Sequence, residues 1–258
     1  MEQHHGLKSQ HLENAEALFG GPQGLLRSAA AAVAHAGADH PSGHPADPTE
    51  QEIRALARFG HDTGLILDAQ AARCLIENSE FVGKGMEHLV VAPEGMNCVL
   101  KDYDPRVFDA ETCEVFYKPA ELLFEYLTDH ILANHFFGDD IRLRGFCLDQ
   151  SHLHVLLTQP FIEGRHPAWQ EMVDLLEAQG LSHERQGSNQ SRFWVDGGSA
   201  GRILVTDVHE DNVIVTAVRS AHPIDVHFSF PSRSARFGVL RNLGLWEQLT
   251  SSAPSPPP

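Results

Sequence analysis

The sequence has few cysteines and few positive charges. Its 4 cysteines are widely spaced and include no CxxC pair, which argues against a disulfide framework or a structural zinc site, so we expect each to be a small buried hydrophobe. Lys and Arg number 19 against 35 Asp and Glu, which gives a formal net charge of -16. We therefore expect no nucleic-acid partner and no anionic membrane surface, because both need a basic footprint. An anionic nucleotide held by a few cations and a metal ion stays compatible with this charge.

Long apolar segments are absent as well. No run of about 18 apolar residues occurs, and the N-terminus carries no apolar signal segment, so we expect a cytoplasmic protein. The hydrophobic share of 42% and the charged share of 21% are typical of a soluble globular protein. A chain of 258 residues can bury a sizeable core, as one domain or as two small lobes.

Changes in composition divide the chain into four parts. Residues 1–48 predict an N-terminal extension and linker, with one Ala-rich helix within 15–34. Residues 49–163 predict a leading helix and an N-lobe, and residues 164–249 predict a reduced C-lobe. The Pro- and Ser-rich residues 250–258 predict a disordered tail.

Residue periodicity predicts an α+β fold. Two apolar strands joined by a turn at residues 93–96 indicate a hairpin, and a helical period follows over residues 119–137. Two further strands lie within 141–162, and an amphipathic helix covers 166–181. Short strand-like pieces come next, the last with the sequence PIDVHFSF. We therefore expect an N-lobe made of an antiparallel sheet with one packed helix.

A polar segment, DVHEDN, lies between two apolar runs that are typical of buried strands. Asp, Asn and Glu are common turn formers, so a hairpin loop is one explanation. Metal ligation is a second, because Asp207, His209 and Asp211 alternate and could converge on one ion. Phosphoryl transfer is a third, because it needs a carboxylate near the attacking hydroxyl and oxygen ligands for Mg²⁺ close by.

Spacing favours phosphoryl transfer. The kinase catalytic loop has an Asn five residues after its Asp, and Asp207 and Asn212 keep this interval. Asp225 ends the next short strand, where kinases have a metal-binding Asp. His209, two residues after Asp207, matches the D-x-H-x-x-N loop of the aminoglycoside and choline kinase branch.

Residues upstream meet further demands of a kinase site. Gly83 and Gly85 supply part of a glycine-rich turn, although G-x-G-x-x-G is not completed. Lys101 ends an apolar strand, the place of the lysine in the V-A-I-K motif of kinases. Glu121 and Glu125 lie one turn apart on the following helix, so either can be the partner of Lys101.

Six motifs together resemble one known family. They are GxGxEH at 83–88, EYL at 125–127, FGDDIRL at 137–143, QPFIEGR at 159–165, DxHxxNV at 207–213 and PID at 223–225. On these motifs, residues 50–232 resemble the serine/threonine/tyrosine-kinase-like domain of polyvalent proteins from phages and conjugative elements. The resemblance implies a reduced two-lobed protein-kinase-like fold and favours Glu125 over Glu121 as the partner of Lys101.

The same resemblance implies an enzyme that moves the γ-phosphoryl group of ATP, with Mg²⁺, to a hydroxyl on a protein, on a small molecule or on itself. It assigns nucleotide binding to Gly83, Gly85, Lys101, Glu125, Gln159 and Phe161. The last two lie in a segment similar to the hinge that meets the adenine ring. It assigns catalysis to Asp207, Lys101 and His209, and Mg²⁺ binding to Asn212 and Asp225.

Departures from the kinase pattern keep alternatives open. Val205 and Thr206 replace the His-Arg pair before the catalytic Asp, so this loop must be braced from elsewhere. His227 replaces the Gly of DFG, and only residues 226–258 follow Asp225, which leaves room for one helix. A nucleotide-binding pseudokinase or partner-binding module is therefore the alternative, and a metal-dependent hydrolase is less favoured.

Overall fold

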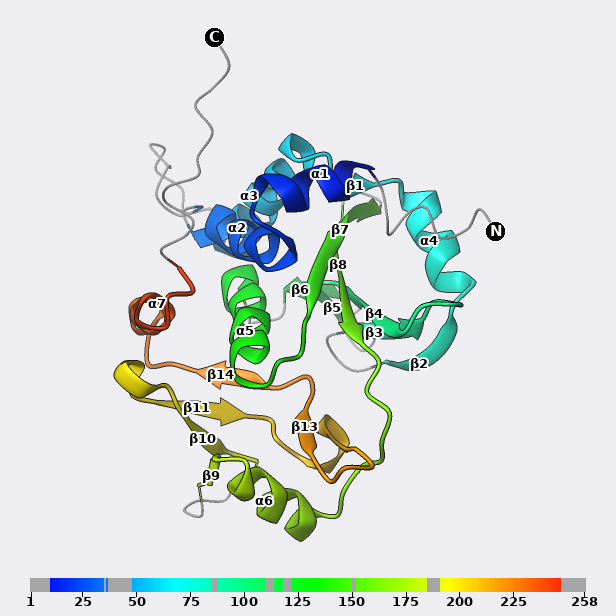
Figure 1. Ribbon diagram of the computed structural model, residues 1–258. Helices are drawn as coiled ribbons and strands as arrows, with labels where there is room; N and C mark the ends of the chain where they lie inside the picture. The colour runs from blue at the N-terminus through cyan, green and yellow to red at the C-terminus, as the bar shows by residue number, and fades with distance from the viewer. Residues whose placement is uncertain are drawn as a thin grey trace. The chain divides into compact units, whose positions relative to one another are not determined.

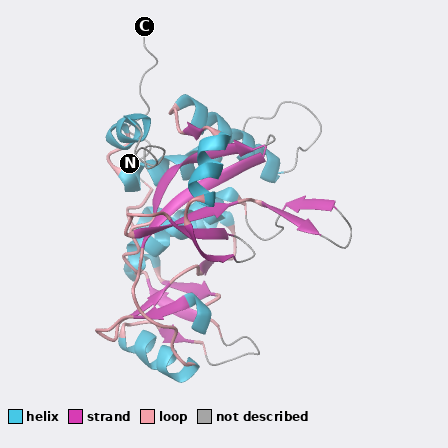
Figure 2. Cartoon of the chain, turned by 90° about the vertical axis from the view of Figure 1, so that its right-hand side faces the viewer, coloured by secondary structure: helices cyan, strands magenta, loops and turns pink. Residues whose placement is uncertain are grey.

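The computed structural model has the α+β class that the sequence predicts. It describes residues 10–34, 36, 48–84, 88–109, 114–117, 122–149, 152–184 and 191–246. These residues divide into two compact units, the first within 1–131 and 140–161 and the second within 132–139 and 162–258. Figure 1 labels the elements, and Figure 2 distinguishes helices in cyan from strands in magenta. Within the described ranges, no helix is both long and apolar enough to span a membrane.

Three helices open the first unit: α1 (Gln10–Leu18), α2 (Pro22–Ala34) and α3 (Pro48–Asp62). The predicted Ala-rich helix within 15–34 is confirmed by α2, which begins only at Pro22 because Gly20 and Gly21 separate it from α1. Both glycines have a positive φ, 77° and 97°, which a right-handed helix does not allow. Pro22 then suits the first position of α2, where its missing N–H leaves no hydrogen bond unmade.

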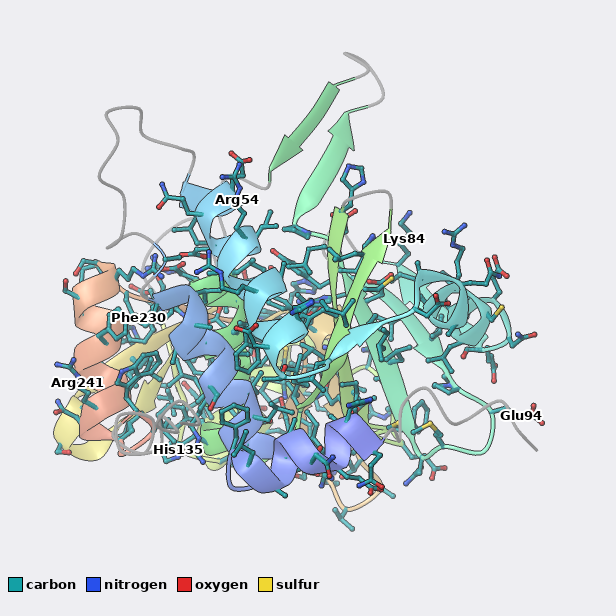
Figure 3. All side chains as sticks on the ribbon, turned by 90° about the horizontal axis from the view of Figure 1, so that it is seen from above. Arg54, Lys84, Glu94, His135, Phe230 and Arg241 are labelled. Atoms are coloured by element: carbon teal, nitrogen blue, oxygen red, sulfur yellow. The ribbon has the colours of Figure 1, made fainter. Side chains whose placement is uncertain are left out.

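Aromatic rings attach this N-terminal segment to the first unit. The ring of Phe19 lies 5.7 Å from that of Phe59 on α3, and Phe59 lies edge-on against Phe146 at 6.2 Å between centroids. Arg54 of α3 points outward (Figure 3) and forms an exposed ion pair with Glu50. Apolar contact therefore holds α3 in place, together with the buried carboxylate of Glu52, which accepts a hydrogen bond of 3.0 Å from the N–H of Phe124.

A six-stranded sheet is the centre of the first unit. Its strands are β1 (Ile66–Leu67), β2 (Glu80–Lys84), β3 (His88–Ala92), β4 (Cys98–Tyr103), β7 (Arg142–Asp149) and β8 (His152–Pro160). Their order is β1-β7-β8-β4-β3-β2, and all neighbours are antiparallel except β1 and β7. The predicted hairpin is confirmed by the pairing of β3 with β4. Strands β5 (Arg106–Asp109) and β6 (Glu114–Tyr117) pair only with each other.

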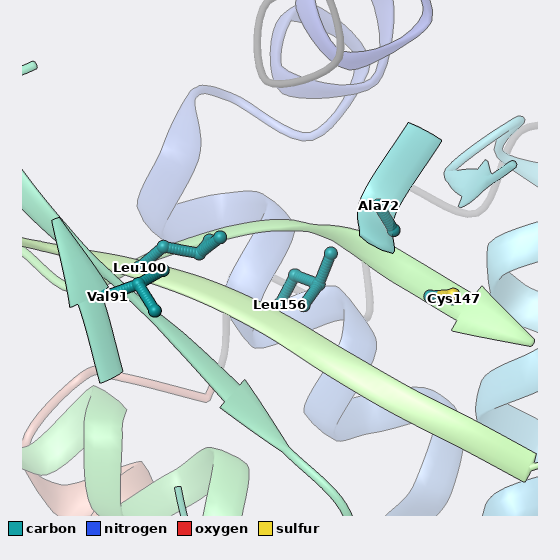
Figure 4. Close-up of a cluster of buried hydrophobic side chains, with 5 residues drawn as sticks. All are labelled: Ala72, Val91, Leu100, Cys147 and Leu156. Atoms are coloured by element: carbon teal, nitrogen blue, oxygen red, sulfur yellow. The ribbon is translucent and has the colours of Figure 1, made fainter. Parts of the chain in front are cut away.

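Different helices cover the two faces of this sheet. Helix α4 (Ala69–Glu77) covers one face. The buried cluster on that face consists of Ala72, Val91, Leu100, Cys147 and Leu156 (Figure 4). Helix α5 (Leu123–Phe136) packs on the other face, where Tyr126 stacks on Tyr103 with ring centroids 3.7 Å apart. Because side chains alternate along a strand, Lys101 and Tyr103 of β4 share the α5 face.

The described cysteines differ in their surroundings. Cys147 is buried, Cys98 is half-buried and Cys74 is exposed, and all three are free thiols. The expectation of a buried hydrophobe is therefore wrong for Cys74, because α4 needs only one apolar face to cover the sheet. Burial raises the pKa of the Cys98 thiol. Cys113 lies outside the described residues.

The second unit is built from short elements. They are α6 (Trp169–Ala178), β9 (Ser182–His183), β10 (Phe193–Asp196), η1 (Gly198–Ala200), β11 (Arg202–Thr206), η2 (Glu210–Asn212), β12 (Val213–Val215), β13 (Ala221–Pro223), β14 (His227–Ser229) and α7 (Arg233–Asn242). One sheet has the order β14-β11-β10-β9, and β12 pairs with β13. Buried Phe193, Val205 and Phe228 lie side by side across the larger sheet. The single strand predicted from PIDVHFSF is two strands, because the chain turns at Asp225 with a φ of 56°.

Candidate active site

Asp207 comes directly after β11 and begins the polar loop. The next residue, Val208, is fully buried, and its N–H donates to the carbonyl of Ser191 at 3.1 Å. The Asp207 side chain, in contrast, is 51% exposed. Burial of one apolar residue therefore anchors the loop, while the carboxylate beside it stays accessible to a bound molecule.

Asn212 joins the predicted catalytic and metal-binding residues. Its Nδ2 donates to the Asp207 carbonyl at 3.0 Å, to Asp207 Oδ2 at 3.2 Å and to the Asp225 carbonyl at 3.2 Å. Its own carbonyl accepts from the N–H of Ile224 at 2.8 Å. The five-residue interval is closed by the 3₁₀ turn η2, so Asp207, Asn212 and Asp225 lie together as the spacing predicts.

Both aspartates have left-handed backbone conformations. Asp207 has a φ of 61° and Asp225 a φ of 56°. Among the described residues other than glycine, only Asp140 and Arg219 also have a positive φ. Such conformations cost free energy in L-residues, although Asp tolerates them better than most, and they concentrate at functional sites. The strained backbone at Asp207 and Asp225 therefore indicates that the directions of their side chains are important for a site.

His209 lies beside the Asp207 carboxylate, with Nε2 3.6 Å from Oδ1, and the two attract each other electrostatically when the imidazole is protonated. Asp211, the third member of the hydrolase hypothesis, is exposed. In the part of the chain that the structure describes, no three side chains of His, Cys, Asp or Glu gather closely enough to hold a metal ion. The described residues thus give the hydrolase hypothesis no support.

Residues 165 and 166 brace the polar loop. His166 Nδ1 lies 3.1 Å from the carbonyl oxygens of both Glu210 and Val213, so this nitrogen must carry the proton and donate to them. Arg165 pairs with Val215 through two backbone hydrogen bonds, of 3.1 and 2.8 Å. The hydrogen bonds of His166 and Arg165 thus support the polar loop, which has Val205 and Thr206 in place of the His-Arg pair of kinases. Sequence reasoning missed His166, although it directly follows the QPFIEGR motif.

The chain runs unusually close to β12 at Gly164. A Cβ on Gly164 would lie 2.5 Å from Cγ2 of Ile214 and 2.5 Å from the carbonyl oxygen of Val215. The neighbouring Arg165 side chain points to Glu171 and donates two hydrogen bonds of 2.8 and 2.6 Å to its carboxylate. These hydrogen bonds hold the pKa of Glu171 below its ordinary value. Both contacts fix the backbone from which His166 reaches the loop.

Lys101 and Glu125 lie on the same side of the sheet in the first unit. Lys101 is 5% exposed, on β4 between β3 and β8. Glu125 belongs to the first turn of α5, and its Oε2 is buried. Because Tyr126 packs α5 against the Lys101 face, the structure brings the helix of Glu125 to the strand face of Lys101. Glu121, the other candidate partner, lies outside the described residues.

Gly83, predicted to lie in a glycine-rich turn, belongs to strand β2. Gly83 pairs with Val90 of β3 just after a β-bulge, and a Cβ on Gly83 would meet nothing within 4 Å. The backbone at Gly83 is therefore open to a ligand on its side-chain face. Phe81 and Val82, just before it, are 64% and 48% exposed. Gly85 lies outside the described residues.

The hinge-like segment begins at the end of β8. Gln159 is 3% exposed, and its Nε2 has no hydrogen-bond partner within the described ranges. Phe161 is 50% exposed, and its N–H donates to the carbonyl of Asn97 at 3.2 Å. The Phe161 N–H is thus already used within the fold, whereas the Gln159 amide keeps a donor for a bound molecule.

Comparison with known families gives a match over most of the chain. The model of the serine/threonine/tyrosine kinases found in polyvalent proteins matches residues 49–230. Comparisons with curated proteins and with solved structures gave no match. The matched region covers more than half of the chain and includes every residue placed above at the candidate site. The chain therefore belongs to the serine/threonine/tyrosine kinase family found in polyvalent proteins.

Proposed function

We propose that this kinase uses ATP and Mg²⁺ and transfers the γ-phosphoryl group to a hydroxyl acceptor. The observation that carries the proposal is the single Asn212 amide that joins Asp207 and Asp225. Phosphoryl transfer depends mainly on positioning and on charge stabilisation, and it uses these residue types at this spacing. The strained conformations of both aspartates support the same assignment.

Asp207 is the proposed catalytic base. Its accessible carboxylate orients the acceptor hydroxyl and takes the hydroxyl proton. The acceptor oxygen then bonds to the γ-phosphorus while the bond from that phosphorus to the bridging oxygen breaks, and ADP leaves with the electron pair. When its imidazole is protonated, His209 restricts the direction of the Asp207 carboxylate, because its Nε2 lies 3.6 Å from Oδ1.

Asn212 and Asp225 are the proposed Mg²⁺ ligands. The hydrogen bonds of the Asn212 side chain to Asp207 and Asp225 all use Nδ2, so its oxygen Oδ1 is the atom that can face a cation. Amide and carboxylate oxygens are the ligands that Mg²⁺ prefers, so the residues present fit this ion. Bound Mg²⁺ supplies neutralisation of the charge on the β- and γ-phosphates.

The first unit supplies the proposed nucleotide-binding groups. Lys101, buried on the sheet face beneath α5, binds the α- and β-phosphates and is steadied by Glu125. The glycine turn at Gly83 and Gly85 lets the backbone approach the phosphates. Gln159 and Phe161 contact the adenine end, with the buried Gln159 amide as a donor to the base.

A nucleotide-binding pseudokinase is the second candidate, and it is favoured by the Val205-Thr206 pair where kinases carry His-Arg. Incubation of the full chain with Mg·ATP separates the two. We expect ADP release, a gain of one or more phosphoryl masses by mass spectrometry when a hydroxyl of the protein accepts, and a raised melting temperature through ligand binding. A raised melting temperature without ADP release would favour the pseudokinase over a kinase that phosphorylates itself. No response to nucleotide would reject both.

A further inference from the structure

Four buried aromatic and imidazole rings form a cluster between the sheet and α5. Tyr126 stacks on Tyr103 at 3.7 Å with 15° between the ring planes, and it lies edge-on to His130 at 4.6 Å. The hydroxyl of Tyr126 lies 3.0 Å from Nε2 of His88, within hydrogen-bond distance. All four residues are at most 7% exposed. The cluster is thus a solvent-excluded contact with defined geometry.

The members of this cluster adjoin the proposed nucleotide-binding residues along the chain. Tyr126 directly follows Glu125 on α5. Tyr103 lies two residues beyond Lys101 on the same face of β4, and His88 opposes Tyr103 as the first residue of β3. One cluster therefore joins the helix that carries Glu125 to the strand that carries Lys101, and to the strand that follows the glycine turn.

Two features of the cluster restrict different motions of α5. The flat stack of Tyr126 on Tyr103 fixes the distance of the helix from the sheet. The hydrogen bond to His88 fixes its rotation, because the hydroxyl must stay within reach of Nε2. A hydrogen bond buried from water resists rearrangement, since opening it costs more free energy there than at the surface.

We propose that Tyr126 and His88 are positioning residues, which hold α5 at the rotation that directs Glu125 toward Lys101. This inference rests on the proposed function, because it assumes that the Lys101–Glu125 pair binds nucleotide. Tyr126→Phe tests it most directly, since the ring stack is kept and only the hydroxyl is lost. We expect kcat/KM for ATP to fall about tenfold, while the melting temperature of the unliganded chain changes little.

Substitutions of His88 provide the matched control. His88→Gln keeps a polar group that can bond the Tyr126 hydroxyl, whereas His88→Leu keeps bulk without one. We expect His88→Gln to retain most of the kcat/KM and His88→Leu to lose as much as Tyr126→Phe. Equal activity of the two His88 variants would overturn the proposal.

A double-mutant cycle shows whether Tyr126 acts through Glu125. Since both variants disable the same pair, Tyr126→Phe should cause no further loss of kcat/KM in a Glu125→Gln background. If the losses of kcat/KM caused by Tyr126→Phe and Glu125→Gln add in full, the positioning role is overturned. It is also overturned if the Tyr126 and His88 variants have a lower melting temperature but an undiminished kcat/KM at temperatures where they are folded. Both outcomes would leave the proposed function intact. A wild-type chain that neither turns over nor binds ATP would reject the proposed function, and the positioning role with it.

Discussion

Lys101 and Asp207 are held in opposite ways. Lys101 is 5% exposed in the middle of a six-stranded sheet, with a helix packed on its face, whereas the Asp207 side chain is 51% exposed on a loop between strands of five and three residues. Regular secondary structure sets the position of Lys101. One side-chain amide, one buried valine and a strained backbone set the position of Asp207. We therefore expect substitutions of buried Lys101 to leave folding intact only when they keep its volume, whereas substitutions of exposed Asp207 should affect turnover and not stability.

The largest effect is expected at Asp207. Asp207→Asn keeps the shape of the loop but removes the base, so turnover should fall by about 10²- to 10⁴-fold. Binding of Mg·ATP and the melting temperature should stay nearly unchanged, because the side chain is exposed. Turnover assays and calorimetric ATP titration measure both. Asp211→Asn is the matched control in the same loop, and comparable losses in the two variants would contradict the kinase assignment.

Replacement of Lys101 should affect binding most. Lys101→Met keeps most of the buried volume and removes the charge, so we expect kcat/KM to fall about 10²-fold and the ATP-induced rise in melting temperature to vanish. The melting temperature without ATP should stay close to that of the wild type. A large drop without nucleotide would instead show that Lys101 is a structural ion-pair member.

Asn212 allows its two proposed roles to be separated. Asn212→Ala removes both the loop contacts of Nδ2 and the oxygen ligand, so the Mg²⁺ requirement should rise about tenfold or more, with partial rescue at high Mg²⁺. Asn212→Asp keeps an oxygen ligand, but it replaces the donor by a negatively charged oxygen that faces the oxygens of Asp207 and Asp225. Titration of turnover with Mg²⁺ should therefore place Asn212→Asp between the wild type and Asn212→Ala. An unchanged Mg²⁺ requirement in Asn212→Ala would remove this residue from the metal site.

The smallest effect is expected at Arg219, where a strained backbone conformation lies outside the proposed site. Arg219 has a φ of 60° in the exposed turn between β12 and β13, outside the proposed site. Arg219→Gly relieves this conformation, and we expect the free energy of unfolding to rise by about 0.5 kcal/mol with turnover unchanged. Val218→Gly, at an adjacent exposed residue without a positive φ, should lower it slightly. Chemical denaturation measures both, and equal changes would show that a positive φ costs little in this protein.

Sequence reasoning succeeded where the signal is local. The apolar strand that carries Lys101, the turn at residues 93–96 and the proximity of Asp207 to Asn212 all depend on neighbouring residues, and the structure has each of them. The strand does not end at Lys101, however, but continues to Tyr103. The tie to Asp225 also follows, because β12 and β13 form one short hairpin.

What the sequence did not reveal depends on contacts between distant segments. The hydrogen bonds from His166 span 44 and 47 residues, and no local pattern distinguishes His166 from the other histidines. The split at Asp225 needs a left-handed conformation that Asp adopts only when its surroundings fix it. The break at Gly20 and Gly21 was obscured because the Ala-rich stretch after it has high helix propensity.

The close approach at Gly164 sets a limit on how this chain can vary. Any side chain at 164 would have to displace β12, which leads out of the polar loop, whereas the neighbouring residues 163 and 165 are exposed. In a library randomised over residues 161–166 and selected for turnover, we therefore expect position 164 to return glycine alone. Sequence variation at position 164 is therefore limited by the space between Gly164 and β12, which is too narrow for one methyl group.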